Sequence, residues 1–305
     1  MRHGFFKQMI MKQVEERYIS LLTDFGFKRI FGSAPNKDLL ICFLNSLFNG
    51  RQVVKDVKYL NPEHVGDVYT DRKAIFDVYC EGENGEKFIV EMQNAYQTYF
   101  KDRALFYSTF PIREQAPKGS EWDFKLNHVY TIALLNFNMN EEAFNKEEIR
   151  HHVQLCDTAT HKIFYDKLEF IYVEIAKFNK SLDELETLYD KWLYVLKNLY
   201  KLTQRPKALC DKVFDRLFEE AEIAKFTPQE QREYEASKMA YRDIKNSIDT
   251  AKREGKEEGL AEGMEKGMNK RSLEIARKML ANGMDAATVM EITGLSESQL
   301  QQLKG

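Results

Sequence analysis

The chain has 305 residues, of which 43% are hydrophobic and 30% are charged, and its formal net charge is -3. This composition excludes a globally disordered chain, and the length allows one sizeable core with one or two smaller units. The net charge excludes a nucleic-acid binder that works through bulk positive charge, so any contact with phosphates needs a local basic patch.

The cysteines Cys42, Cys80, Cys156 and Cys210 are far apart and form no CxxC pair of the kind that binds zinc or cycles between redox states. Two of them, Cys42 and Cys80, lie inside apolar runs, where a buried free thiol is expected. Reduced cysteines suit a cytoplasmic protein. The N-terminal Met1–Gln13 makes a poor signal peptide, and no apolar run approaches membrane-spanning length, so we expect no membrane partner.

Signals for helix and strand alternate up to about residue 137. In Asn36–Phe48 the apolar residues recur at helical spacing, and Gly50 is expected to end that helix. The next elements are expected to be three strands, a helix and a further strand: Lys55–Leu60, Ala74–Glu81, Lys87–Gln93, the helix Tyr96–Arg113 and the strand Val129–Phe137. This mixed order predicts an α/β fold in which helices flank a sheet.

The second half is expected to be mostly helical. Strands are predicted at Val153–Leu155 and Leu168–Ile175, and helices at Leu182–Lys201 and Lys207–Lys252. Trp192 and its apolar neighbours in the first of these helices are expected to be core contacts.

A short repeat follows, in which glycine recurs every four residues among charges from Glu254 to Gly267. On a helix these glycines would form one stripe that permits the close approach of a second helix, although each costs roughly 1 kcal/mol relative to alanine. Both a solvated connector and a pairing helix fit this pattern.

The tail from residue 271 to residue 305 is predicted to form two helices around Gly294, with Ser296 as the N-cap of the second. Its apolar spacing is similar to that of a helix-turn-helix. The second helix carries mainly glutamate and glutamine, and Lys304 is its one cation. Because a helix that reads a DNA groove needs positive charge, the sequence favours packing or oligomerisation for this tail.

The two strands Ala74–Glu81 and Lys87–Gln93 each have one wholly apolar face, because side chains alternate between faces along a strand. The two apolar faces lie on the same side of the hairpin only if the two residue numbers of each facing pair add to an even number. That condition predicts a three-residue loop, Glu83-Asn84-Gly85, with Gly85 in the left-handed region. The resulting register has three apolar pairs: Phe76 with Met92, Val78 with Val90, and Cys80 with Phe88.

On the other face this register places Asp77 directly across from Glu91, with Gln93 across from Ile75. Two facing carboxylates repel each other, so a shared proton, a nearby lysine or arginine, or a divalent cation is expected to offset the repulsion. Magnesium takes oxygen ligands from one or two carboxylates together with phosphate. A metal site and a solvated polar face are both compatible with the pairing.

The residues around these carboxylates resemble the PD-(D/E)xK nuclease superfamily, in particular the Rpn-type recombination-promoting nucleases and transposase-like proteins. The stretches that carry the resemblance are Thr23–Gly32, Ile75–Tyr79, Ile89–Gln93, Tyr99–Arg103, and Tyr107-Ser108 with Phe110-Pro111. It covers residues 20–137 well, and the glycine repeat with its helical tail is typical of the group. The resemblance implies a restriction-endonuclease-like α/β core at 17–140, a strand extension and helical region at 141–252, the connector or pairing helix at 253–270 and the helix-turn-helix-like tail at 271–305.

The resemblance also implies site residues. Asp77 and Glu91 would bind Mg²⁺ or Mn²⁺, with the backbone carbonyl of Met92 as a further ligand. Gln93 stands where the superfamily pattern has a lysine, and since an amide cannot accept a proton as an amine does, it would orient the attacking water. Asp24 matches an acidic position in the first motif, where it would either complete the acidic cluster or cap the helix before Phe25.

Contacts with DNA are expected from Arg103, Lys101 and Lys73. Arg103 would clamp a phosphate or form a surface ion pair, and Lys101 or Lys73 would supply the charge that Gln93 lacks. The implied activity is hydrolysis of DNA phosphodiester bonds by a homodimer, associated with recombination or mobile elements. Two rival hypotheses are a catalytically weak DNA- or protein-binding module of the same fold and an oligomer driven by the helical tail.

Overall fold

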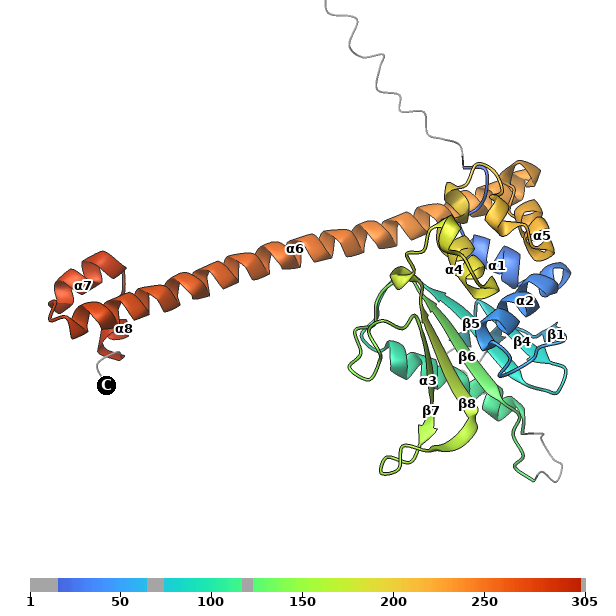
Figure 1. The fold of residues 1–305 in the computed structure, drawn as a ribbon, viewed down its shortest axis with the longest axis horizontal. Coiled ribbons are helices and arrows are strands. Elements are labelled where there is room, and N and C mark those ends of the chain that lie inside the picture. Colours follow the sequence, from blue (N-terminus) through green and yellow to red (C-terminus); the bar gives the residue numbers. More distant parts are fainter. Residues whose placement is uncertain (1–15, 65–73, 117–122, 303–305) are drawn as a thin grey trace, which may run out of the picture. The chain divides into compact units, whose positions relative to one another are not determined.

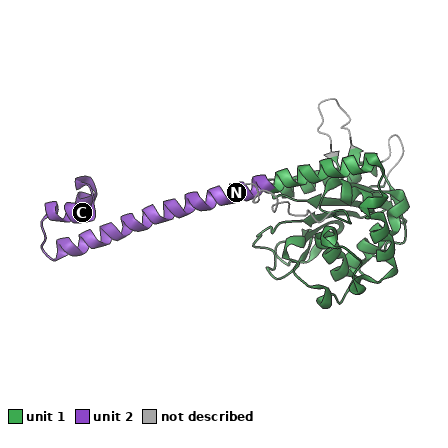
Figure 2. Ribbon diagram, turned by 90° about the horizontal axis from the view of Figure 1, so that it is seen from above, with its two compact units in different colours: residues 1–245 green, residues 246–305 purple. Residues whose placement is uncertain are grey.

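The computed structural model describes residues 16–64, 74–116 and 123–302. The chain divides into two compact units, residues 1–245 and residues 246–305 (Figure 2). In the part of the chain that the structure describes, no helix is both long and apolar enough to cross a membrane.

The first unit is built on a six-stranded sheet with the order β1-β4-β5-β6-β8-β7 (Figure 1). Its strands are β1 (Val57–Tyr59), β4 (Val78–Gly82), β5 (Lys87–Gln93), β6 (Val129–Leu135), β7 (Arg150–Cys156) and β8 (Ile163–Glu174). The central strands β5, β6 and β8 run parallel, and the outer pairings are antiparallel. A separate two-stranded ladder joins β2 (Glu63–His64) to β3 (Ala74–Ile75). The predicted sheet flanked by helices is confirmed.

Helices cover both faces of this sheet. On one face α1 (Asp24–Phe31), α2 (Lys37–Phe48), α4 (Leu188–Asn198) and α5 (Lys212–Glu220) pack into the main core. On the other face α3 (Phe100–Glu114) packs through Phe110 against Phe76, Tyr79 and Ile89. Trp192 of α4 is fully buried among aromatic rings of α1 and α2, as expected for a core contact.

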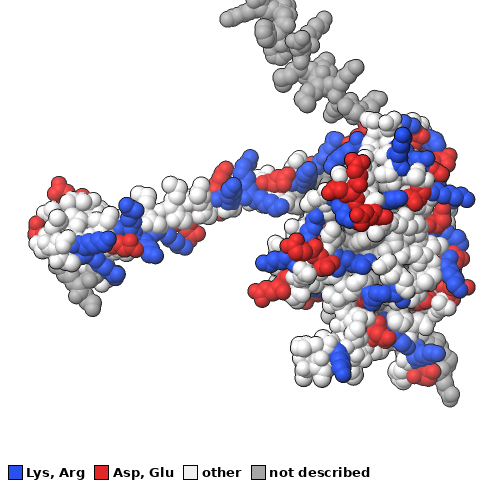
Figure 3. All heavy atoms as spheres, in the orientation of Figure 1, with Lys and Arg blue, Asp and Glu red and all other residues white. Residues whose placement is uncertain are grey.

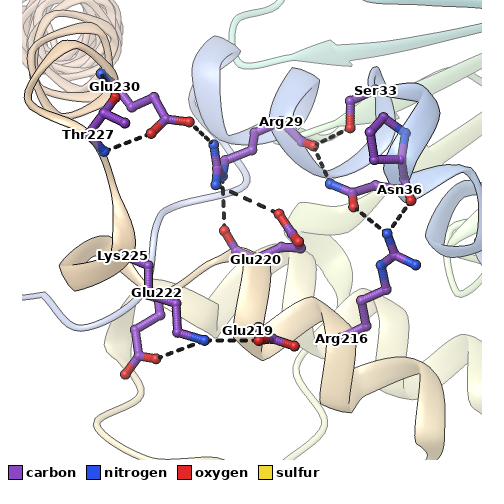
Figure 4. A network of polar contacts seen from close by, with 11 residues as sticks. Arg29, Ser33, Asn36, Arg216, Glu219, Glu220, Glu222, Lys225, Thr227 and Glu230 are labelled. Atoms are coloured by element: carbon purple, nitrogen blue, oxygen red, sulfur yellow. Dashed lines mark hydrogen bonds and ion pairs between the residues drawn. The ribbon is translucent and has the colours of Figure 1, made fainter.

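A polar network fixes α1 against α5 and the start of α6 (Pro228–Ala281) (Figure 4). The Arg29 guanidinium donates to the Glu220 carbonyl at 2.9 Å and to the Glu230 carboxylate at 2.5 Å. The backbone carbonyl of Arg29 in turn accepts from the side chains of Ser33 and Asn36. Because both the backbone and the side chain of Arg29 are held, the last turn of α1 has a defined position in the first unit.

The second unit begins inside α6 and continues with α7 (Ala286–Thr293) and α8 (Glu297–Gln302). Its core is a cluster of four buried side chains: Ala276, Val289, Leu295 and Leu300. Gly294 ends α7 with a φ of +69°, and the Ser296 hydroxyl accepts from the backbone of Gln299 at 3.3 Å. The predicted helix pair around Gly294, with Ser296 as the cap, is therefore confirmed.

The helical prediction for 207–252 is wrong in detail. That segment holds a short 3-10 turn, Lys207–Leu209, then α5 and a second turn, Ile223–Lys225, before α6 begins at Pro228. Further 3-10 turns lie at Ala34–Asn36, Ile175–Lys177, Leu182–Glu184 and Leu199–Lys201. Proline explains the late start of α6, because its fixed φ suits the first turn of a helix and interrupts an interior. The glycine repeat is helical throughout.

The hairpin of β4 and β5 has the predicted register, with Val78 opposite Val90 and Cys80 opposite Phe88. Gly85 has a φ of +84°, as the three-residue loop requires. The third predicted pair, Phe76 with Met92, is wrong.

The chain leaves the hairpin ladder before Val78, because the preceding residues bond elsewhere. Ile75 pairs with Glu63 of β2 instead of with Gln93, and the Phe76 N–H donates to the Pro62 carbonyl at 3.0 Å. The Phe76 ring therefore turns to the α3 face of the sheet, where it meets Tyr79 edge-on. The break also reorients Asp77.

Candidate active site

The sequence-predicted carboxylates meet where β5 ends. Asp77 lies just before β4, outside the ladder, and its Oδ2 accepts from the backbone N–H of Met92 at 2.9 Å. Asp77 therefore reaches β5 beside Glu91 through a side chain-to-backbone hydrogen bond. It does not face Glu91 as a cross-strand pair, which corrects the predicted geometry.

The Met92 backbone is directed toward the same point. The N–H and C=O of one strand residue are directed to the same side of the strand. Since the Met92 N–H binds Asp77, the Met92 carbonyl also faces the Asp77 side. The Gln93 carbonyl, one residue on, accepts from Asn136 after β6, as this alternation requires.

Glu91 is 8% exposed, and its two carboxylate oxygens have different surroundings. Oε2 accepts from the Gln93 amide at 3.1 Å, whereas Oε1 is buried with no hydrogen-bond partner among the described residues. Burial, together with the charge of Asp77, raises the pKa of Glu91 to about 8, although the Arg103 guanidinium opposes this. A buried acceptor without a donor is costly, so this carboxyl is poised to take a proton or a cation.

The pKa of Asp77 is also raised by burial, against the opposing effects of the Met92 N–H and of Lys28. The buried carboxylate of Glu91, the partly buried carboxylate of Asp77 and a backbone carbonyl form a set of hard oxygen donors, the kind that Mg²⁺ and Mn²⁺ accept. Within residues 16–64, 74–116 and 123–302, no three His, Cys, Asp or Glu side chains gather as a ligand cluster. A cation at this point would therefore complete its coordination with water or phosphate oxygens.

Gln93 connects Glu91 to a positive charge. Its amide nitrogen donates to Glu91, and its Oε1 accepts from the Arg103 guanidinium at 2.6 Å. A second nitrogen of Arg103 donates to the Gln97 side chain at 2.5 Å. The guanidinium on α3 therefore lies one side chain away from the carboxylates.

A second cation, Lys28, was not identified from the sequence. Its ammonium is 2.6 Å from an oxygen of Asp24 and 3.9 Å from an oxygen of Asp77. Burial opposes the charge on Lys28, but the hydrogen bond to Asp24 and the nearby carboxylates raise its pKa overall. The signal that could have revealed it is the four-residue spacing between Asp24 and Lys28, which puts both on one face of α1.

Asp24 has neither of the two geometries predicted for it. The N-cap of α1 is Thr23, whose hydroxyl accepts from the Gly26 N–H at 3.1 Å. Asp24 is exposed in the first turn and is linked to Asp77 through Lys28. It belongs to the surroundings of the acidic pair and does not act as a cap.

Of the two lysines predicted to replace the missing charge, Lys101 is engaged elsewhere. Lys101 forms an exposed ion pair with Glu141 at 2.9 Å. Lys73 lies outside the described residues. Among the residues that the structure places, the cations beside the carboxylates are Arg103 on α3 and Lys28 on α1.

Comparison with known families agrees with this arrangement. The family described as "PD-(D/E)XK nuclease family transposase" matches residues 21–251, which include the whole site. The domain described as "Rpn/YhgA-like nuclease family, C-terminal HTH domain" matches residues 269–305, and it assigns a helix-turn-helix where the sequence had favoured mere packing or oligomerisation. Neither curated proteins nor solved structures gave a match. The chain belongs to the PD-(D/E)XK nuclease family of transposases and carries the C-terminal helix-turn-helix domain of the Rpn/YhgA-like nucleases.

Proposed function

We propose that this protein is a metal-dependent endonuclease that hydrolyses phosphodiester bonds of DNA in the cytoplasm, in recombination or the mobility of genetic elements. The observation that carries the proposal is Glu91, a buried carboxyl with one unpartnered oxygen beside a second, partly buried acid, Asp77. A fold that needed these acids only for stability would give each oxygen a donor.

In this proposal Asp77, Glu91 and the Met92 carbonyl bind Mg²⁺ or Mn²⁺. The bound ion would polarise a phosphate oxygen and lower the pKa of a water molecule. Gln93 would hold the water in place, since its amide is itself oriented by Glu91 and Arg103. Arg103 would bind a non-bridging phosphate oxygen, and Lys28 would limit the negative charge on Asp77.

The competing function is a binding module of the same fold without catalysis, which the glutamine at position 93 favours. Nicking of a supercoiled plasmid distinguishes the nuclease from the binding module. It is measured for the native chain with Mg²⁺, for the native chain with EDTA, and for Asp77→Ala with Mg²⁺. Glu186→Ala, which changes an exposed carboxylate away from the site, is the matched control. We expect nicking only by the native chain and the control in Mg²⁺. Equal nicking by Asp77→Ala, or none by any protein, would remove the nuclease proposal.

We also propose a homodimer, because cutting both strands of DNA takes two sites. Three exposed apolar residues, Leu260, Met264 and Met268, each follow a glycine of the repeat in α6. A Cβ added at Gly259, Gly263 or Gly267 would meet nothing within 4 Å. This apolar stripe suits a second copy of the helix. Met264→Glu is expected to lower the molar mass in solution from dimer to monomer, and an unchanged mass would contradict the proposed contact.

A further inference from the structure

A groove opens on α3 next to the carboxylates, with a volume of about 940 Å³. We call it the aromatic groove, and it is lined by Tyr96, Gln97, Thr98, Tyr99, Asp102, Arg103, Phe106 and Tyr107. Its size is in the range of clefts that bind small molecules or single nucleotides.

The rings of this groove are unusually exposed. Tyr99 is 75% exposed, Tyr96 is 53% exposed and Phe106 is 44% exposed. Tyr99 is the N-cap residue of α3, and Arg103 and Phe106 follow it at steps of four and three residues, so all three lie on the same side of the helix. The contact of α3 with the sheet is made by other residues, including Phe110. None of the three exposed rings belongs to a buried cluster of the described residues, and Phe106 only meets the edge of that core through Phe110. Contiguous exposed aromatic surface of this kind points to a binding role.

The groove is continuous with the site through Arg103. One nitrogen of its guanidinium donates to Gln93, which contacts Glu91, and another donates to Gln97 in the groove wall. The same guanidinium lies 5.8 Å from the centre of the Tyr107 ring. A nucleotide bound in the groove would thus be adjacent to the phosphate held at the carboxylates.

The chemistry of the groove fits an unpaired nucleobase. Aromatic side chains stack on bases whose faces are free, and in a duplex those faces are covered by neighbouring base pairs. Arg103 supplies a cation for the flanking phosphate. Asp102 and Gln97 offer polar atoms for the edge of a base.

We propose that the aromatic groove binds an unpaired base of DNA directly beside the scissile phosphate, with Tyr99 and Phe106 as the stacking residues. This inference rests on the proposed nuclease function and specifies its substrate class. The favoured substrate is DNA with a single-stranded segment at the cut, such as a gap, an overhang or a flap.

Binding without cleavage tests the groove by itself. Fluorescence anisotropy in EDTA compares the full chain on a labelled single-stranded DNA and on a duplex of the same sequence. Tyr99→Ala and Phe106→Ala should each weaken single-strand binding about 5- to 150-fold, which corresponds to about 1–3 kcal/mol. Tyr99→Phe should bind like the native chain because it keeps the ring, and duplex affinity should not change.

The variants are chosen to leave the fold intact. The Tyr99 side chain makes no capping hydrogen bond to α3. Phe164→Ala, at a strongly exposed ring on β8, is the matched control and should bind normally. In a set of single strands, an abasic nucleotide replaces each base in turn. At one position this replacement should remove the base that stacks on Tyr99, so that the native chain and Tyr99→Ala bind that strand with equal affinity. Equal losses on duplex and single strand, no loss with either variant, or tighter binding of a single-stranded RNA of the same sequence would overturn the proposal.

A cleavage measurement keeps the two proposals separable. In Mg²⁺ the native chain should cut gapped DNA faster than intact duplex, and Tyr99→Ala should lose that preference while it still cuts the duplex. If single strands bind through Tyr99 but nothing is cut, the nuclease proposal fails and the groove remains. If DNA is cut with equal preference by both proteins, the groove proposal fails and the nuclease remains.

Discussion

Two buried carboxylates near the C-terminal ends of parallel strands of the sheet have opposite electrostatic surroundings. Glu174, at the end of β8, is 1% exposed, and Glu91, near the end of β5, is 8% exposed. Glu174 accepts from the Met139 N–H at 2.6 Å and contacts His151 at 3.0 Å and the ammonium of Lys177. Burial alone would raise the pKa of Glu174, but Lys177 and these hydrogen bonds outweigh it and lower the pKa.

Glu91 is almost as deeply buried but has one amide donor and a raised pKa. Burial therefore does not distinguish the two acids, whereas the number of donors does. Glu169 on β8 repeats the first pattern, with Arg51 and His152 as partners, and its pKa is lowered despite burial. A carboxylate with all its partners inside the protein stabilises the fold, and one that lacks them is suited to a ligand from outside. The surface charge does not mark the site in this way, because acidic and basic side chains are intermingled on the visible surface of the first unit (Figure 3).

The largest expected effect is on nicking of plasmid DNA. Glu91→Gln keeps the shape of the side chain but removes its charge, so metal-dependent nicking should fall on the order of 10²–10³-fold, the scale for loss of one group that stabilises the transition state. Glu174→Gln should nick within a few-fold of the native rate. Similar losses in both variants would show that the two carboxylates do not differ in role.

The sequence alone predicted the part of the site that depends on strand periodicity. Alternation along two strands and a glycine at position 85 were enough to give the register of Val78 with Val90, because a shift of one residue would expose an apolar face. The same periodicity put Glu91 and Gln93 on one face. The resemblance to the nuclease superfamily added the interpretation of these residues.

The remaining geometry depends on contacts between distant segments, which local patterns do not contain. Asp77 is turned toward Met92 because β3 pairs with β2, and no alternation in Ala74–Glu81 signals that break. The approach of Lys28 to Asp77 depends on the packing of α1, which Arg29 anchors to α5 and α6. The sequence likewise gave no reason to select Arg103 over Lys101, since only the fold shows which of them faces Gln93.

The pH dependence of stability in the absence of metal provides the next test. Between the ordinary value of 4.5 and about 8, folded Glu91 keeps a proton that the unfolded chain has released. The free energy of unfolding in EDTA should therefore fall as pH rises through this window, on the order of a few kcal/mol in total, and become level above it. The lowered pKa values of Glu169 and Glu174 act below 4.5 and do not contribute to this slope.

Urea midpoints measured between about pH 5 and pH 8 in EDTA check this expectation. Glu91→Gln should remove most of the slope, because its amide does not titrate, and Mg²⁺ added at the upper end should restore stability to the native chain. A native profile that rises with pH, or one that Glu91→Gln leaves unchanged, would contradict the raised pKa.

The smallest expected effect is on the free energy of unfolding, which should change in opposite directions for Glu174→Gln and Glu91→Gln. Glu174→Gln removes the charge that His151 and Lys177 contact, so it should lower the free energy of unfolding by about 2 kcal/mol near pH 8. Glu91→Gln at the same pH and without metal should raise it, because the native chain there holds a partly ionised buried carboxyl with an unpartnered oxygen, whereas the amide stays neutral. Chemical unfolding of the two variants beside the native protein measures both changes. If both substitutions destabilise the fold, Glu91 is a structural acid like Glu174, and the unpartnered oxygen no longer supports a cation at this end of β5.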